Sequence, residues 1–293
     1  MNRQRMLFGL TGALLAALAL PAAAADEAPL VLGSYAYPGI DRALALAPLA
    51  EVVEDAAGQP VEVRLYKDPD AIAAAVAAGE VDVAVLNLGA WLGAARTPGL
   101  VPLATLQPSA AVQDRYRAVL LARAGLDVAG LAGVAEAAPG LRLAAVLRGS
   151  TSGGLVQLAA LTEAKAGAPA SLAITYAGSH EAALATLVAG NADLAALAET
   201  PWRKWREANP DAAAPPVEIW RSEPLPSGPV VCRPSSRIDC GKLAVSLASE
   251  NAETRAAAQG IAQGWPELAG AERFTPYDTA RYAPLIAAAA PTP

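Results

Sequence analysis

The residues best suited to chemistry form one short run of glycines and hydroxyl side chains, Gly149-Ser150-Thr151-Ser152-Gly153-Gly154. The run lies between an apolar stretch, 141–147, that predicts a buried strand and a stretch, 155–166, that predicts a helix. A strand-to-helix junction presents free backbone N–H groups and the positive end of the helix dipole, and hydroxyl groups add further donors. The run therefore predicts a binding site for an anion.

The only histidine of the chain, His180, stands at a second junction of this kind, in the sequence Gly178-Ser179-His180-Glu181. A lone histidine is more often a structural residue than a ligand contact, and that interpretation stays open. The closeness of the two junctions in the chain predicts one shared pocket. In that pocket a neutral His180 nitrogen would accept a hydrogen bond from a protonated ligand.

Other kinds of site fit these residues less well. The run has neither the Gly-Lys-Ser/Thr ending of a Walker A loop nor the Gly-x-Ser-x-Gly spacing of a nucleophile elbow. A hydrolase would need Ser152, His180 and Asp193 as nucleophile, base and orienting acid, but Asp193 lies inside a strand-like stretch. One histidine and two clustered cysteines cannot complete a zinc site. We expect a binding protein without catalytic residues, metal or cofactor, and a secreted serine hydrolase is the weakest alternative.

The first 25 residues are typical of a cleavable secretory signal, with a basic start, an apolar run over 6–20 and small residues over 22–25. The apolar run is too short for a membrane anchor. No cysteine near the cleavage site could accept a lipid. Since no second long apolar segment follows, we expect a soluble protein in the periplasm.

The chain is acidic, with 22 Lys and Arg against 28 Asp and Glu. The signal holds two of the basic residues and none of the acidic ones, which leaves 20 against 28 and a net charge of −8 in the mature chain. An acidic protein without basic runs is unsuited to nucleic acid or an anionic membrane. Trp202 and Trp205, interleaved with basic residues, predict a surface helix.

Two cysteines, Cys232 and Cys240, lie close together in the sequence. In an oxidising compartment such a pair favours a local disulfide, although spacing alone cannot fix the pairing. A thiol pair that binds a soft metal or a metalloid is the alternative.

Strand-like and helix-like stretches alternate after residue 29. Expected strands are 30–33, 61–66, 81–86, 116–122, 141–147, 172–176, 192–197, 217–221 and 229–233, and expected helices include 40–57, 70–78, 242–249 and 253–265. Near-continuous apolar strands between helices predict an α/β fold with mixed, mainly parallel sheets.

A mature chain of about 270 residues is too long for one core and predicts two lobes with a ligand cleft between them. We expect lobe 1 to comprise 26–113 and 225–293, and lobe 2 to comprise 114–224. Ligands of open α/β sheets bind beyond the carboxyl ends of the strands. Four expected junctions lie there, at Ser34, Asn87, Ser150 and Ser179.

Five motifs, in order, resemble the phosphate, phosphite and phosphonate class of ABC transporter substrate-binding proteins. They are Gly-Glu-Val-Asp-Val-Ala (79–84), Gly-Ser-Thr-Ser-Gly (149–153), Gly-Ser-His-Glu-Ala-Ala (178–183), Gly-Asn-Ala-Asp-Leu-Ala (190–195) and Leu-Pro-Ser-Gly-Pro-Val-Val (225–231). The resemblance covers essentially the whole mature chain, and the Ser-Thr-Ser and Gly-Ser-His motifs are its most specific part.

The resemblance implies a two-lobed periplasmic binding protein of the type II kind. It implies that Ser150, Thr151, Ser152 and His180 hold the oxyanion from lobe 2, and that Tyr37, Asn87 and Trp91 contribute from lobe 1. An acid after the strand 192–197 often accepts a ligand proton in this class, and Glu199 is the nearest candidate. This chain departs from the usual Gly-Pro-x-x-Tyr first-lobe turn, because it has Asn87-Leu88-Gly89-Ala90-Trp91 there.

The implied partners are a small oxyanion, most simply a phosphonate, phosphite or phosphate, and an ABC permease in the inner membrane. A sensor that presents a metalloid or other oxyanion to a membrane receptor kinase is the alternative within binding proteins. We expect a monomer.

Overall fold

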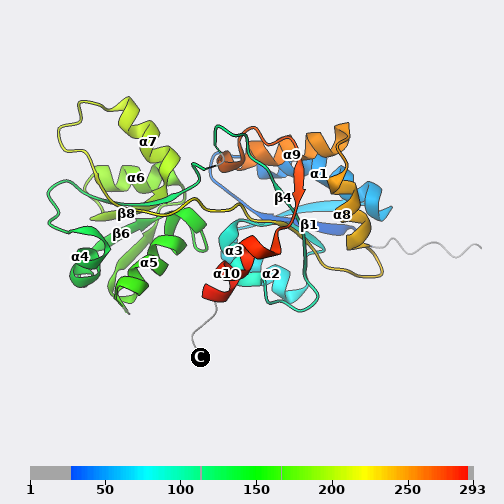
Figure 1. The fold of residues 1–293 in the computed structure, drawn as a ribbon, viewed down its shortest axis with the longest axis horizontal. Helices are drawn as coiled ribbons and strands as arrows, with labels where there is room; N and C mark the ends of the chain where they lie inside the picture. The colour runs from blue at the N-terminus through cyan, green and yellow to red at the C-terminus, as the bar shows by residue number, and fades with distance from the viewer. Residues whose placement is uncertain (1–27, 113, 166, 290–293) are drawn as a thin grey trace, which may run out of the picture.

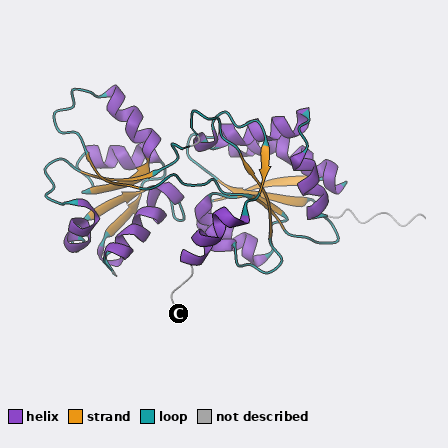
Figure 2. Ribbon diagram, viewed as in Figure 1, coloured by secondary structure: helices purple, strands orange, loops and turns teal. Residues whose placement is uncertain are grey.

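The computed structural model describes residues 28–112, 114–165 and 167–289, so the predicted signal lies outside the described residues. Two α/β lobes lie side by side and are joined by two extended segments (Figure 1). Each lobe has one sheet with helices packed against both faces (Figure 2). Within the described part of the chain, no helix has both the length and the apolar character needed to cross a bilayer.

Lobe 1 contains a six-stranded sheet in the order β11-β4-β10-β3-β1-β2. Its first elements are β1 (Leu30–Tyr35), α1 (Arg42–Ala57), β2 (Val61–Tyr66), α2 (Pro69–Ala78), β3 (Val83–Val85), α3 (Leu88–Ala94) and β4 (Val101–Leu106). Its last elements, after lobe 2, are β10 (Val230–Cys232), α8 (Cys240–Ala248), α9 (Ala252–Gly264), the 3₁₀ turn Pro266–Leu268, β11 (Phe274–Pro276) and α10 (Thr279–Ala288).

Lobe 2 contains a five-stranded sheet in the order β7-β6-β8-β5-β9. Its elements are β5 (Ala118–Ala122), α4 (Gly130–Ala137), β6 (Arg142–Ala145), a π-helical turn (Thr151–Leu155), α5 (Val156–Ala164), the 3₁₀ turn Pro169–Ser171, β7 (Ala173–Tyr176), α6 (His180–Val188), β8 (Leu194–Ala198), α7 (Glu199–Ala208) and β9 (Val217–Arg221). The predicted pair of α/β sheets is therefore confirmed. The lobe boundaries at 113/114 and 224/225 stay predictions.

The sheets are mixed, but parallel pairing does not dominate in the described residues. The βαβ units pair β1 with β2 and β3, and β6 with β7 and β8, in parallel. The strands next to the connecting segments run antiparallel instead: β10 to β3 and β4, β11 to β4, and β5 to β8 and β9. A strand that enters or leaves a lobe does not follow a crossover helix, so it has no reason to be parallel to its neighbours.

Polar residues at the strand ends begin several helices of both lobes. The side chains of Asp41, Asp68, Asn87 and Ser179 each accept a hydrogen bond from a backbone N–H in the first turn of the helix that follows. Such caps satisfy donors that the helix itself leaves unpaired. As a result α1 begins at Arg42, two residues later than the sequence pattern indicates.

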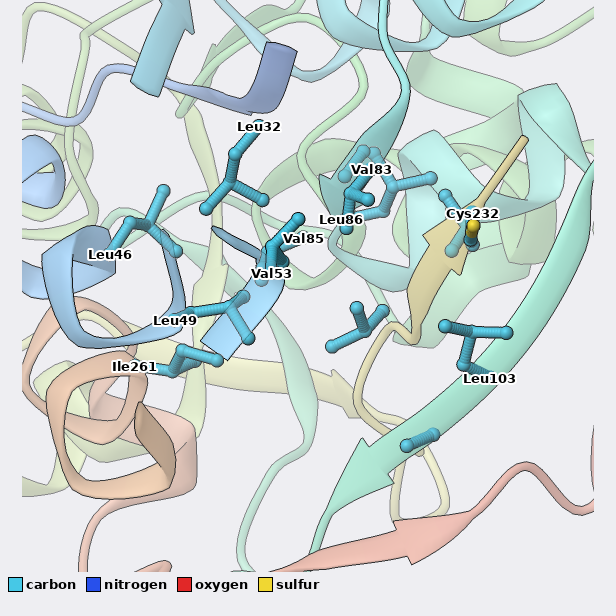
Figure 3. Packing of buried hydrophobic residues seen from close by; sticks show 14 of the residues in the cluster. Leu32, Leu46, Leu49, Val53, Val83, Val85, Leu86, Leu103, Cys232 and Ile261 are labelled. Carbon is cyan, nitrogen blue, oxygen red and sulfur yellow. The ribbon is translucent and has the colours of Figure 1, made fainter. Parts of the chain in front are cut away.

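The core of lobe 1 packs Leu and Val side chains of the sheet against α1 and α9, as Figure 3 shows for Leu32, Leu49 and Ile261. Lobe 2 has two smaller clusters, one on each face of its sheet. The first involves α6 and α7, and the second involves α4 and α5. Two separate cores with few connections between them suit a molecule that binds between its lobes.

Cys232 of β10 and Cys240 of α8 form a disulfide with a Cα–Cα distance of 5.8 Å. Both residues are buried in the lobe 1 core. The predicted local disulfide is present, and the alternative of a free thiol pair for a soft metal or metalloid is wrong.

Candidate functional site

A cavity of about 490 Å³ lies between the lobes and is lined by side chains of both. Lobe 1 contributes Tyr35, Tyr37, Arg42, Asn87 and Glu267, among others. Lobe 2 contributes the Ser-Thr-Ser run and His180, and the first connecting segment contributes Arg115 and Tyr116. Six of the eight residues expected to bind the ligand therefore meet here: Ser150, Thr151, Ser152, His180, Tyr37 and Asn87.

The Ser-Thr-Ser run forms a tight turn rather than the first turn of a capped α-helix. Two glycines leave helical geometry, Gly153 at φ −114° and ψ 26° and Gly154 at φ 164° and ψ −58°, so α5 begins only at Val156. Ser150 precedes the π-helical turn without capping it through its side chain. The buried Gln157 amide donates to the carbonyl of Ser152 and fixes the turn to lobe 2. Ser150 and Ser152 line the cavity, and the Ser150 side chain does not cap a helix.

The same turn touches lobe 1 directly. The Asn87 amide nitrogen donates to the carbonyl of Gly149 at 3.2 Å, and the backbone N–H of Gly89 donates to Thr151 Oγ1 at 2.8 Å. Gly149 has φ +70°, a conformation that favours glycine. A Cβ atom on Gly89 would overlap the Gly149 carbonyl oxygen. The two lobes thus meet backbone to backbone beside the cavity.

His180 is the first residue of α6, and its tautomer follows from its hydrogen bonds. Its Nδ1 accepts the backbone N–H of Ala198 at 3.1 Å. Burial, and next the positive charge of Arg42, lower the pKa of His180 to about 4. The imidazole is therefore neutral at pH 7, with its proton on Nε2. The expectation that a neutral His180 nitrogen accepts a hydrogen bond from a protonated ligand is wrong, because Nδ1 already accepts from Ala198 and Nε2–H is a donor.

Tyr37 of lobe 1 contacts His180 of lobe 2. The Tyr37 hydroxyl oxygen accepts the backbone N–H of His180 at 3.1 Å, and the two rings lie 6.3 Å apart. Burial raises the pKa of Tyr37 to about 12, so the phenol keeps its proton at neutral pH. Because the oxygen accepts from the protein, its O–H is left to donate to a ligand in the cavity.

Arg42 supplies a fixed positive charge that the sequence analysis missed. It is 3% exposed, its Nε donates to the carbonyl of Gly264 at 3.0 Å, and Nη1 donates to that of Tyr35 at 3.2 Å. The guanidinium carbon lies 4.1 Å from the ring centres of both Tyr35 and Trp265. Nothing in the local pattern around 42 marks it, since two of its contacts, Gly264 and Trp265, lie more than 200 positions later in the chain.

Glu267 and Tyr116 are two further polar residues of the cavity that the sequence analysis missed. Burial raises the pKa of Glu267, and the positive charge of Arg42 opposes that shift. Burial also raises the pKa of Tyr116, while the nearby hydroxyls of Ser152 and Thr151 lower it. Neither residue belongs to a recognisable motif, because the connecting segment and the 3₁₀ turn that carry them have no periodic pattern.

Trp91, Glu199 and Ser34 do not reach the cavity, contrary to expectation. Trp91 is 2% exposed in the lobe 1 core, where its indole N–H donates to the Tyr277 hydroxyl at 3.0 Å. The Glu199 carboxylate forms an ion pair with Arg221 at 2.8 Å. The Ser34 hydroxyl donates to the carbonyl of Val85 within the sheet at 2.8 Å. Each of these polar groups already has a partner inside its own lobe.

The residues weighed as a hydrolase triad are not brought together. His180 bonds to Ala198, the last residue of β8, whereas Asp193 directly precedes that strand. Asp193 accepts hydrogen bonds from Arg123 and Arg142, which hold the pKa of its carboxyl far below its usual range. A strand of five residues separates the two groups by roughly 16 Å. Asp193 therefore cannot orient His180.

The chain matches the family model described as the periplasmic substrate-binding protein of a phosphonate ABC transporter, over residues 41–280. A comparison with curated protein sequences gave no match. The chain belongs to this family of periplasmic phosphonate-binding proteins. The match favours the transport role over the sensor and hydrolase alternatives.

Solved structures show the same fold at low sequence identity. PhnD1 of Prochlorococcus marinus, solved with methylphosphonate, is 16% identical with a TM-score of 0.63, and the alignment covers 88% of this chain and 96% of that one. A Xanthomonas citri protein solved with ATP is 19% identical with a TM-score of 0.68, over 89% and 96% of the two chains. The binding component of an ABC phosphonate transporter from Pseudomonas aeruginosa is 18% identical with a TM-score of 0.62, over 88% and 84%.

Proposed function

We propose that this protein captures a phosphonate, or a closely related phosphorus oxyanion, in the cavity between its lobes and delivers it to an inner-membrane permease from the periplasm. The single observation that carries the proposal is the convergence of donors from both lobes on one cavity. From lobe 2 these are the Ser150 and Ser152 hydroxyls and the Nε2–H of His180. From lobe 1 it is the Tyr37 hydroxyl.

The chemistry of these groups suits an anion with several oxygens. Two of the donors are held in place by other contacts: Tyr37 by the His180 backbone, and His180 by Ala198. Hydrogen bonds to a charged acceptor contribute about 1.5 to 3 kcal/mol each when the donors need no rearrangement. The protonation state of neutral hydroxyl and imidazole donors does not change near pH 7, so these donors remain available to an anion over that range.

Lobe closure completes the site in this proposal. Asn87 and Gly89 bond to the carbonyl of Gly149 and the hydroxyl of Thr151, so closure brings the Ser-Thr-Ser turn against lobe 1. Thr151 therefore secures the closed arrangement, whereas Ser150 and Ser152 bind the ligand. A ligand that adds contacts from both lobes shifts the protein toward that arrangement.

Titration calorimetry of the mature chain tests this function. We expect methylphosphonate and phosphite to bind with 1:1 stoichiometry at pH 7, and we expect no turnover of either. Chloride and acetate, which lack a tetrahedral oxyanion, are the controls. Absence of heat and of thermal stabilisation with phosphonates, phosphite and phosphate would contradict the proposal.

A further inference from the structure

The buried guanidinium of Arg42 has no direct ion pair. The side chain is 3% exposed, and it forms no ion pair with Asp or Glu in the part of the chain that the structure describes. Its Nε and Nη1 donate to backbone carbonyls, and Nη2 has no acceptor among the described residues. Glu267 lines the same cavity and interacts electrostatically with Arg42, but not at ion-pair distance. A buried charge without a direct ion pair is costly, so the unused Nη2 of Arg42 beside a cavity points to an anion that binds there.

The other charged groups of the cavity also favour an anionic ligand. Arg115, Arg203 and Lys204 also line it, against two acids, Glu181 and Glu267. Burial raises the pKa of Glu267, and the charge of Arg42 opposes that shift. An excess of basic groups in one cavity contrasts with the net charge of −6 of the whole chain. The cavity is therefore suited to a ligand that carries negative charge.

Arg42 lines the cavity from lobe 1, with its guanidinium carbon 5.1 Å from the ring centre of Tyr37. It belongs to the start of α1 in lobe 1, packed between Tyr35 and Trp265, whereas Ser150 and Ser152 belong to lobe 2. A volume of about 490 Å³ is within the range of cavities that hold drug-sized organic ligands. Methylphosphonate has only five non-hydrogen atoms, and it would leave most of this space unfilled.

We propose that the ligand of this protein carries two anionic groups, and that Arg42 binds the second of them. This inference rests on the proposed function, since the Ser-Thr-Ser turn takes the phosphonate group. The second group is a carboxylate or a further phosphoryl group, and the planar guanidinium suits either. The two tyrosines and the indole around Arg42 keep the guanidinium in place and exclude water from one side of it.

Two probe ligands that differ by one carboxylate test the inference. Methylphosphonate carries only the phosphonate group, and phosphonoacetate adds a carboxylate to the same carbon. The affinity of the mature chain for each is measured by titration calorimetry at pH 7 and constant ionic strength. We expect phosphonoacetate to bind at least about tenfold more tightly, since one charge-assisted pair is worth a factor of this order.

Variants of Arg42 assign that preference to one side chain. Arg42→Gln should reduce the preference to less than about twofold, and Arg42→Lys should retain part of it because the charge remains. Arg64→Gln is the matched control, because Arg64 pairs with Glu62 on the surface of lobe 1. It should leave both affinities unchanged.

The outcomes separate this inference from the proposed function. Equal binding of the two probes by the wild-type chain, or tighter binding of methylphosphonate, would overturn the inference while the proposed function stands. A preference that persists in a folded Arg42→Gln variant would overturn the role of Arg42. If Arg42→Gln does not fold, two other results test the inference. They are the preference of the wild type for phosphonoacetate and the partial retention of that preference in Arg42→Lys. Binding of neither probe would contradict the proposed function and this inference together.

Discussion

At the scale of single residues, the binding properties of the cavity depend on which groups have already used their hydrogen-bonding atoms. The tautomer of His180 is set by Ala198, and the direction of the Tyr37 hydroxyl is set by His180. Sequence motifs identify both side chains but not these second contacts. For this reason the sequence placed a proton acceptor at His180, where the structure provides a donor.

The low pKa of His180 predicts a pH dependence of stability. The folded protein keeps the imidazole neutral to about pH 4, whereas the unfolded chain takes up a proton near pH 6.5. His180 therefore contributes stability that is fully present above pH 6.5 and is lost as the pH falls to about 4. The loss amounts to at most about 3 kcal/mol.

Urea denaturation of the wild type and of His180→Gln at pH 7 and pH 4.5 measures this contribution. The glutamine carbonyl can still accept a hydrogen bond, but it does not titrate. We expect the free energy of unfolding of the wild type to fall more than that of the variant over this range. An equal fall in both proteins would show that His180 is not held neutral.

Ser150, Thr151, Ser152 and His180 were predictable because their local pattern is unusual. Arg42 and Glu267 were not, because an arginine at a helix start and a glutamate in a turn are common on surfaces. The burial of Arg42 depends in part on Gly264 and Trp265, which come from a distant part of the chain. Glu199 was wrongly predicted to contact the ligand, because its ion-pair partner Arg221 belongs to β9, which comes later in the chain.

At the scale of elements, the strand-to-helix junctions control where lobe 1 meets lobe 2. Glycine at position 89 lets the start of α3 approach the Gly149 carbonyl directly. The sequence predicted both junctions but not their contact with each other. Most βαβ units were also predictable from their apolar periodicity. The strands β4 and β11 were not predicted, because their pairing depends on neighbours that lie far away in the sequence.

Gly89→Ala tests the contact between the junctions. The added methyl group would overlap the Gly149 oxygen, so we expect the closed arrangement to be disfavoured and the affinity for methylphosphonate to fall at least tenfold, which is about 1.4 kcal/mol or more. Thermal stability of the ligand-free chain should change little, since a helical alanine is intrinsically favourable.

Gly93→Ala is the matched control for this variant. Gly93 belongs to the same helix, and its added Cβ would lie 3.6 Å from that of Ala73, an ordinary van der Waals contact. Its affinity should equal that of the wild type. Unchanged affinity in Gly89→Ala would mean that ligand binding does not require the two junctions to meet.

At the scale of the whole molecule, two α/β lobes with separate cores are joined by two segments (Figure 1), and the cavity is lined by residues of both. Chain length and alternation of elements predicted this architecture. The mainly parallel pairing was not found, because the strands next to the connecting segments join the sheets antiparallel. A cavity shared by two lobes lets a small ligand contact a large part of the protein and report its presence through lobe closure.

The most direct measurement of the central claim is the affinity for methylphosphonate of a Ser150→Ala/Ser152→Ala variant. Both hydroxyls line the cavity, so removal of two hydrogen bonds to a charged ligand should weaken binding at least tenfold, about 1.4 kcal/mol or more, without lowering the melting temperature of the ligand-free chain. Ser171→Ala, an exposed serine of the same lobe, should bind like the wild type. Wild-type affinity in the folded double variant would contradict the assignment of the phosphonate site to the Ser-Thr-Ser turn.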